Sequence, residues 1–501
     1  MLDVRKLYRP LQTKLLSLDL RALLQLIWFA QSRLQNSGEL EVRNEAGPIG
    51  KIYYWELVVL SREALLNCTP GVRKRKPQEA DLVKLVSLVR RIEETISCRT
   101  ISSGDDALRA MHSRVHQQAR WQNMRDWDRM YRAYRIYNDP EMQPILEKAI
   151  GLRLASAWTL ALAVSGGANS SPMVSSKIDY GLVGVPADEQ RAFFKMVGSH
   201  RRDIKTILEN SRRIDEGWAR SWNALESTPL VNLDTHNPTE YVCPLPALLL
   251  LRVTEGLFYD LVKSGQKYGK PYGHAFEAYV GEVLVAQFKR STHRVAAEQP
   301  YFVGKNRKLG VDWTVSDSTG HIMIECKARR MKLSAKELDD GEDLQQSLED
   351  LTESIVQHYR NISDAKNGFA EFEPDGLPIY PFIVTYEDWR LFAPHVVNRL
   401  YGLVEDKLRS LDLLELMRLS PFTVTSIEEF EKAGQAIAQI GIAKFCAERV
   451  KQPFRHFGLG GYADHAFHDI DVTYCRLFPD SDIQMLGHLA HLFPLPSRVL
   501  A

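Results

Sequence analysis

The sequence predicts a multidomain α/β protein, with a mostly helical N-terminal region, a central α/β core and a C-terminal α/β or helical extension. The length of 501 residues indicates several domains, because single hydrophobic cores seldom grow beyond about 250–300 residues. Before residue 237, apolar residues recur at the three- and four-residue spacing of helices, and further on some stretches alternate as strands do. We therefore expect three parts, at residues 1–237, 238–393 and 394–501.

Composition and charge narrow the classes of function. The formal net charge is only +1, so any affinity for nucleic acid must come from local basic patches. The cysteines are scattered without a CxxC pair, which argues against a disulfide framework and a zinc ribbon. The first residues lack the layout of a signal peptide, and the apolar runs are short or interrupted by charges. We expect a cytoplasmic protein without a membrane partner.

Helical periodicity dominates the N-terminal part, in stretches such as residues 18–34 and 79–96. A short strand is expected at residues 50–55, and a flexible loop at residues 165–172 (SGGANSSP). Between residues 114 and 135, arginines interleave with aromatic residues, a pattern that suits phosphate contact and base stacking. The same aromatic residues also form a helical stripe, so we favour a place in the core for them.

The central part predicts the order helix, hairpin, helix, strand. It begins with a long apolar helix at residues 246–265, a Gly/Pro turn at residues 269–273 and a second helix at residues 274–288. Strands are expected at residues 309–315 (LGVDWTV) and 321–328 (HIMIECKA), joined by a turn. A helix follows whose apolar face consists of Leu344, Leu348, Leu351, Ile355, Tyr359 and Ile362. Further strands are expected at residues 377–386 and 421–425.

Four pairs of the form [DE]-x-K occur in the chain, and only one is predicted to lie in a strand. The other three are Asp203/Lys205 and Glu405/Lys407, in helix-like stretches, and Asp364/Lys366, in a predicted loop. In the strand at residues 321–328, the spacing of two places Glu325 and Lys327 on one face. A carboxylate and an ammonium on an otherwise apolar strand are costly unless they are paired or functional. The plain alternative is a structural Glu–Lys pair at a sheet edge.

Asp312 lies in the preceding strand, where a hairpin brings it beside Glu325. Two converging carboxylates offer the oxygen ligands that magnesium prefers, with waters and substrate phosphate completing its shell. A metal there lowers the pKa of a bound water and offsets charge on the phosphate. Lys327 is then placed to orient the attacking water or to stabilise phosphate oxygens.

These elements resemble the PD-(D/E)xK superfamily of nucleases. The matching stretches are AFEAYVGEVL, GVDWTV and MIECKAR, and the resemblance covers about residues 269–386. Val311 stands where the family name has proline, which leaves the acid that carries the chemistry in place. The resemblance implies a restriction-endonuclease-like core with a mixed sheet. It also implies a further acid on the helix, for which Glu277 is the closest match and Glu282 the reserve.

The resemblance implies a magnesium-dependent endonuclease, with manganese as a substitute metal. Double-stranded DNA is the expected substrate, and similar architectures often act in bacterial restriction or anti-phage defence. A homo-oligomer or a regulatory protein partner fits this class, because a duplex has two strands to cut. The alternatives are a non-catalytic nucleic-acid-binding or scaffold protein with the same fold, and an RNase. Basic residues that flank the site are expected to neutralise phosphates: Lys305, Arg307, Lys308, Arg329 and Arg330.

Overall fold

The chain forms two compact units. The computed structural model describes all residues except 1–2, 35–39, 45–46, 72, 102, 105–106, 108–126, 290, 333–334, 337–340, 371, 373–374, 390, 392–393, 452–453, 455–456 and 488–501. The first unit comprises Met1–Ala107, Gln117–Tyr268 and Asp480–Ala501, and the second comprises Leu108–His116 and Gly269–Pro479. This division differs from the expected boundaries at 237/238 and 393/394, since the main change of unit falls between Tyr268 and Gly269.

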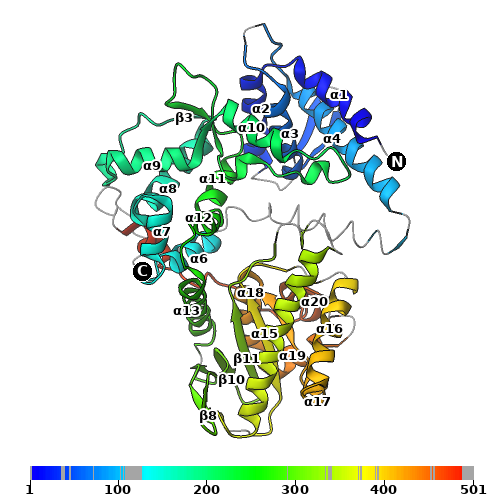
Figure 1. The fold of residues 1–501 in the computed structure, drawn as a ribbon, viewed down its shortest axis with the longest axis vertical. Coiled ribbons are helices and arrows are strands. Elements are labelled where there is room, and N and C mark those ends of the chain that lie inside the picture. Colours follow the sequence, from blue (N-terminus) through cyan, green and yellow to red (C-terminus); the bar gives the residue numbers. More distant parts are fainter. Residues whose placement is uncertain are drawn as a thin grey trace. The chain divides into compact units, whose positions relative to one another are not determined.

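The first unit is mostly helical, as predicted (Figure 1). Its helices are α1 (Val4–Leu16), α2 (Leu20–Leu34), α3 (Tyr54–Asn67), α4 (Glu79–Thr100), α6 (Trp127–Tyr137), α7 (Gln143–Ile150), α8 (Leu154–Ser170), α9 (Ala187–Val197), α10 (Arg201–Ser211), α11 (Pro246–Val253), α12 (Leu257–Ser264) and α21 (Ser481–Leu486), with short 3-10 turns η1 (Gly181–Val183), η2 (Trp218–Arg220) and η3 (Ala224–Glu226). Strands β1 (Leu40–Asn44) and β2 (Gly47–Ile52) pair with each other. A four-stranded sheet has the order β3 (Met173–Ser175), β6 (Glu240–Val242), β5 (Leu230–Asn232), β4 (Gly198–His200).

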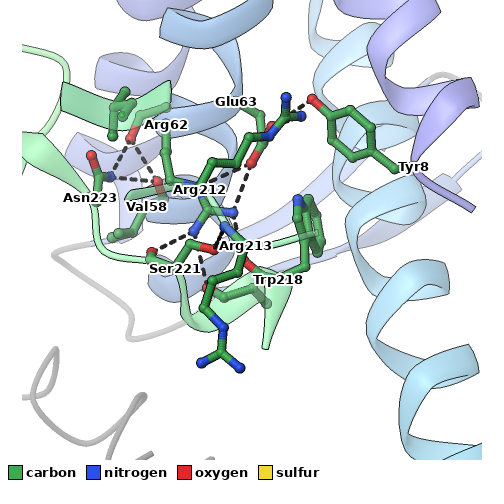
Figure 2. Close-up of polar contacts among 12 residues, drawn as sticks. Tyr8, Val58, Arg62, Glu63, Arg212, Arg213, Trp218, Ser221 and Asn223 are labelled. Carbon is green, nitrogen blue, oxygen red and sulfur yellow. Dashed lines mark hydrogen bonds and ion pairs between the residues drawn. The ribbon is translucent and has the colours of Figure 1, made fainter. Parts of the chain in front are cut away.

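A buried polar network lies within this unit around Arg62 and Glu63 of α3 (Figure 2). Arg62 is 2% exposed and Glu63 is 0% exposed. Arg62 Nη2 donates to Glu63 Oε1 at 2.8 Å, and its Nη1 donates to the Ser221 carbonyl at 2.6 Å. The Tyr8 hydroxyl donates to Glu63 Oε2 at 2.7 Å. The ion pair therefore joins α1, α3 and the segment after η2 inside the core.

Two predictions for this unit are wrong, one of a loop and one of a helix. The expected loop at residues 165–172 is the end of α8, which continues to Ser170. Ala168 is buried there and its carbonyl accepts a hydrogen bond from Trp28 Nε1 at 2.7 Å, so tertiary contacts stabilise a helix that contains two glycines. The expected single helix at residues 246–265 is broken between α11 and α12. At this break a Cβ on Gly256 would lie 2.5 Å from the Arg252 carbonyl oxygen.

The second unit is built on a mixed five-stranded sheet. Its order is β13 (Thr423–Ser426), β12 (Ile379–Thr385), β11 (His321–Lys327), β10 (Trp313–Ser316), β7 (Arg294–Ala297), and a separate hairpin joins β8 (Tyr301–Val303) to β9 (Asn306–Lys308). β11, β12 and β13 run parallel, whereas β10 is antiparallel to both β11 and β7. The helices are α13 (Gly269–Gln287), α15 (Glu342–Lys366), α16 (Pro394–Arg409), α17 (Leu414–Leu419), α18 (Ile427–Ile440), α19 (Ile442–Arg449) and α20 (Leu459–Ala466).

Helices cover both faces of this sheet. Met323 of β11 packs with Ile362 of α15, and all six apolar residues predicted for that helix face are buried. On the opposite face, Phe382 of β12 packs edge-on against Phe430 of α18 at 6.1 Å. The strands predicted at residues 321–328, 377–386 and 421–425 are confirmed, with shifts of at most two residues at their ends.

The elements before β10 differ from expectation in two places. The strand predicted at residues 309–315 begins only at Trp313, so Asp312 lies immediately before β10. The Gly/Pro turn predicted at residues 269–273 is the first turn of α13. Pro271 is tolerated there because the first N–H groups of a helix have no intrahelical acceptor. The helix therefore begins earlier and carries Glu277 in its third turn.

Candidate active site

Glu325 and Lys327 lie at the carboxyl end of β11, with their side chains paired. Lys327 Nζ donates to Glu325 Oε1 at 2.6 Å, and Glu325 is only 6% exposed. Burial lowers the pKa of Lys327, but the carboxylates of Glu325 and Asp312 outweigh it and hold that pKa above its ordinary value. Burial also acts to raise the pKa of Glu325, yet His358 and Lys327 outweigh it and hold the pKa below the ordinary value. Both groups therefore carry charge at neutral pH.

Asp312 reaches β11 from the neighbouring chain segment. The backbone N–H of Cys326 donates to Asp312 Oδ2 at 2.6 Å, which places the carboxylate between the positions of Glu325 and Lys327 along β11. Burial and then the charge of Glu325 raise the pKa of Asp312 to about 8. Two buried carboxylates that interact in this way favour a nearby cation.

Glu277 is brought to the site by the packing of α13 on β10. Trp313 Nε1 donates to the Glu277 carbonyl oxygen at 3.1 Å. One helical turn further, a Cβ on Gly281 would lie 2.2 Å from Trp313 Cζ2, so only glycine lets the indole approach this closely. Burial raises the pKa of Glu277, and the charge of Glu325 raises it further. Glu282 lies five residues later and therefore on another face of the helix, which favours Glu277 as the helix acid.

Sequence reasoning missed Glu298, a fourth acid beside these groups. Its backbone N–H donates to the Asp312 carbonyl oxygen at 2.8 Å. Burial raises the pKa of Glu298, and the charges of Glu277 and Glu325 raise it further. No sequence signal could have found it, because its position depends on the pairing of β7 with β10.

Sequence reasoning also missed His358, which is fully buried on α15. Its Nε2 lies 3.0 Å from the Met323 carbonyl oxygen, and its Nδ1 lies 3.7 Å from Glu325 Oε2. Both ring nitrogens thus face oxygens of β11. A signal was present, since a histidine three residues after Ile355 and four before Ile362 falls on the apolar face of the helix.

The donor set fits magnesium better than a metal that needs several protein ligands. Among the residues that the structure describes, no group of three or more His, Cys, Asp and Glu side chains is arranged to hold a metal ion. Magnesium typically binds through one or two carboxylates and keeps several waters, which Asp312 and Glu325 could supply. Glu325 Oε2 is buried and has no hydrogen-bond partner in the described part of the chain. Such an oxygen costs free energy unless a cation or its water approaches it.

Two of the five predicted phosphate-binding residues are exposed on one hairpin, and the other three contact neighbouring side chains. Lys305 and Arg307 are exposed on the β8–β9 hairpin. Lys308 Nζ instead donates to Asp364 Oδ2 at 2.7 Å, and Arg329 pairs with Asp350 at 2.5 Å. Arg330 lies over the Tyr386 ring at 4.6 Å.

Two other sequence patterns, the remaining [DE]-x-K pairs and part of the arginine–aromatic segment, lie in helices. The remaining [DE]-x-K pairs lie within α10, α15 and α16, so the predicted loop around Asp364 is wrong. Residues 114–126 of the arginine–aromatic segment lie outside the described residues. In α6, Tyr131 is buried, which confirms the core interpretation for this residue, whereas Trp127 and Tyr134 are half-buried.

No protein-family model, no curated protein and no solved structure matches the chain. Within the described residues, no single helix has the length and apolar character needed to cross a membrane. Only α7 and α8 taken together reach that length and composition, with a bend of 62° between them.

Proposed function

We propose that this protein is a metal-dependent nuclease that hydrolyses phosphodiester bonds of DNA. Asp312, Glu325 and Lys327 form its site, and Glu277 supports it. The proposal depends on one geometric observation at the carboxyl end of β11: Lys327 pairs with Glu325 at 2.6 Å, and the N–H of Cys326 between them donates to Asp312 at 2.6 Å. Glu277 is brought to the same place because its carbonyl oxygen accepts a hydrogen bond from the indole of Trp313, the residue after Asp312. A chance Glu–Lys pair would not require two further acids to be packed against it.

Each side chain has a role that follows from its charge. Asp312 and Glu325 provide oxygen ligands for magnesium, and Glu277 holds a water or a further position of the metal shell. When bound, the metal would supply a water of lowered pKa and offset negative charge on the phosphate. Lys327 stays protonated, because its pKa lies above the ordinary value, so it cannot accept a proton. It acts instead by orienting the water or by stabilising a phosphate oxygen.

The β8–β9 hairpin is the surface that we expect to contact the DNA backbone. Both ends of this hairpin connect to the site, since Glu298 precedes it and Asp312 follows it. Lys305 and Arg307 are exposed on it, and Phe302 is 61% exposed directly across from Arg307. Exposed cations suit phosphates, and an exposed ring suits base stacking.

The test is cleavage of linear and supercoiled DNA with magnesium, manganese, calcium or EDTA. We expect cutting with magnesium or manganese and none with EDTA. Lys327→Ala and Asp312→Asn should each lower the rate by at least 100-fold, within the range for lost charge stabilisation. Lys332→Ala is the matched lysine control, since Lys332 pairs with Asp343 at 2.7 Å and should leave the rate unchanged.

A second comparison concerns the helix acid and the substrate. Glu277→Gln should slow cleavage, whereas Glu282→Gln should not.

If the wild type binds DNA but cuts neither DNA nor RNA with any metal, the chain is a binding protein and the nuclease proposal fails. If it cuts RNA alone, through the same residues, the site stands and the substrate is wrong.

A further inference from the structure

A pocket of about 220 Å³ lies at the carboxyl ends of β12 and β13 in the second unit. Leu400 and Tyr401 of α16 line one side, and Glu429 of α18 and Arg449 of α19 line another. Ligands of α/β proteins commonly bind beyond the carboxyl ends of parallel strands. The pocket is larger than the cavity of about 150 Å³ that accommodates a benzene ring. It therefore has room for a ring system with polar substituents.

Two buried N–H groups of the residues that line this pocket have no hydrogen-bond partner within the described part of the chain. Arg449 is 7% exposed; its Nη1 and Nη2 donate to the carbonyls of Phe454 and Phe457 at 2.8 and 2.7 Å. Its Nε has no hydrogen-bond partner among the described residues, and neither does Nε1 of Trp389, which is 3% exposed. A buried donor without an acceptor typically costs about 1–3 kcal/mol. A ligand with acceptor atoms would remove this cost.

The other lining groups define what kind of ligand fits. Tyr401 and Phe422 are stacked with ring centroids 4.5 Å apart, so the walls are aromatic. Of the lining residues that the structure describes, Asp388 and Glu429 are acidic and Arg449 alone is basic. Two acids against one cation in this described lining disfavour a free phosphate or carboxylate ion. A neutral, flat ring that carries both hydrogen-bond donors and acceptors at its edge fits these aromatic walls, acidic residues and N–H donors.

We propose that this pocket binds a nucleobase. Thr385 and Ser426, which line it, lie in one row with Lys327 across the parallel strands. Two strand spacings separate Lys327 from Ser426, which is about 10 Å. The base can belong to a free nucleoside or to an unpaired nucleotide of the strand at the candidate active site. The second source depends on the proposed nuclease function; the first does not.

Binding is measured on the full chain with two kinds of probe. Adenosine, guanosine, cytidine and thymidine are titrated by calorimetry, and 2-aminopurine placed in single-stranded and duplex oligonucleotides is followed by fluorescence in EDTA. Val450→Trp fills the pocket from its half-buried rim and should weaken binding at least tenfold. Trp389→Phe keeps an aromatic ring but removes the indole N–H together with the five-membered ring that carries it, and should weaken binding several-fold. Val285→Trp, at an exposed position of α13, is the matched control and should bind as the wild type does.

Each outcome decides one question. Binding of free nucleosides that Val450→Trp removes supports the pocket with a small-molecule source, and binding seen only with oligonucleotides supports a strand base. If the wild type binds no probe, or if folded Val450→Trp binds every probe as tightly as the wild type, the proposal is overturned. Cleavage is measured on the same samples. A protein that binds nucleosides but cuts nothing refutes the nuclease proposal alone, and one that cuts but binds no base refutes the pocket alone.

Discussion

His358 is the residue whose contacts distinguish a built site from a chance Glu–Lys pair. A buried imidazole from α15 lies 3.7 Å from Glu325 Oε2, while Lys327 of β11 pairs with the other oxygen of that carboxylate. Polar groups that support a reacting residue in this way act by positioning it.

His358→Phe keeps a flat aromatic ring, somewhat larger than imidazole, and removes both polar contacts. We expect kcat to fall about 10–100-fold with little change in KM, the size of effect seen when supporting groups of metal sites are removed. Steady-state cleavage kinetics measure both constants. Thr352→Val is the matched control on the same helix, since Thr352 is equally buried and, among the described residues, bonds only to the Leu348 carbonyl. Equal kinetic constants for the two variants would show that His358 does not position Glu325 for the reaction.

Asp81 supplies a pH-dependent part of the stability of the first unit. Arg75 donates to both of its oxygens at 2.7 and 2.9 Å, and the N–H of Gln78 donates at 3.0 Å. The hydrogen bonds from Arg75, chiefly, hold the pKa of Asp81 well below its ordinary value. A depressed pKa contributes stability that is present above about pH 4 and is lost as the pH falls through the folded-state pKa.

Asp81→Asn should therefore lower the free energy of unfolding at pH 7 by about 1–3 kcal/mol. The gap between variant and wild type should narrow as the pH falls below about 4, because the Asp81 carboxylate of the unfolded wild type then binds a proton while that of the folded wild type stays ionised. Urea unfolding at pH 7, 5 and 3 measures this gap. A gap that stays constant over this range would contradict the assigned role of the charge.

At the scale of elements, the contact of α13 with β10 places Glu277 at the site. Gly281→Ala puts a methyl group into the Trp313 indole and should cost about 1–3 kcal/mol through overpacking. It should also slow cleavage, because the helix that carries Glu277 must move. Gly273→Ala is the control on the same helix, with no atom within 4 Å of the new Cβ. Thermal melts and cleavage rates of the two variants should differ; matching values would show that the approach of Trp313 is not needed.

If the β8–β9 hairpin contacts phosphates, it contributes to the salt dependence of DNA affinity. Replacing both Lys305 and Arg307 by alanine removes two phosphate contacts and should lower the slope of log K against log salt by about 1.8. DNA affinity at several salt concentrations, by fluorescence anisotropy in EDTA, gives the slope. Lys407→Ala/Arg409→Ala on α16 is the matched pair and should leave it unchanged. A loss of affinity without a change of slope would show that the hairpin acts by shape rather than by charge.

At the scale of the whole molecule, a destabilising substitution in one unit should lower the unfolding temperature of that unit alone, because the two units have separate cores. Removing one member of a buried ion pair costs about 3–5 kcal/mol, so Glu63→Ala should destabilise the first unit strongly. In calorimetry we expect the transition of that unit to fall by about 10 °C, while the transition of the second unit keeps its temperature. The exposed Glu415→Ala serves as control. A single transition that shifts as a whole would show that the two units unfold as one.

The sequence by itself determined the alternation on β11 and the spacing that pairs Glu325 with Lys327, because side-chain direction in a strand depends only on the period of two. It also determined the apolar face of α15, for the same reason of local periodicity. Only the tertiary structure decided that α8 continues through its glycines, that Glu298 and His358 join the site, and that Glu277 rather than Glu282 faces it. These depend on which elements pack together, as the contact of Gly281 with Trp313 shows, and residues distant in sequence make such contacts without leaving a local pattern.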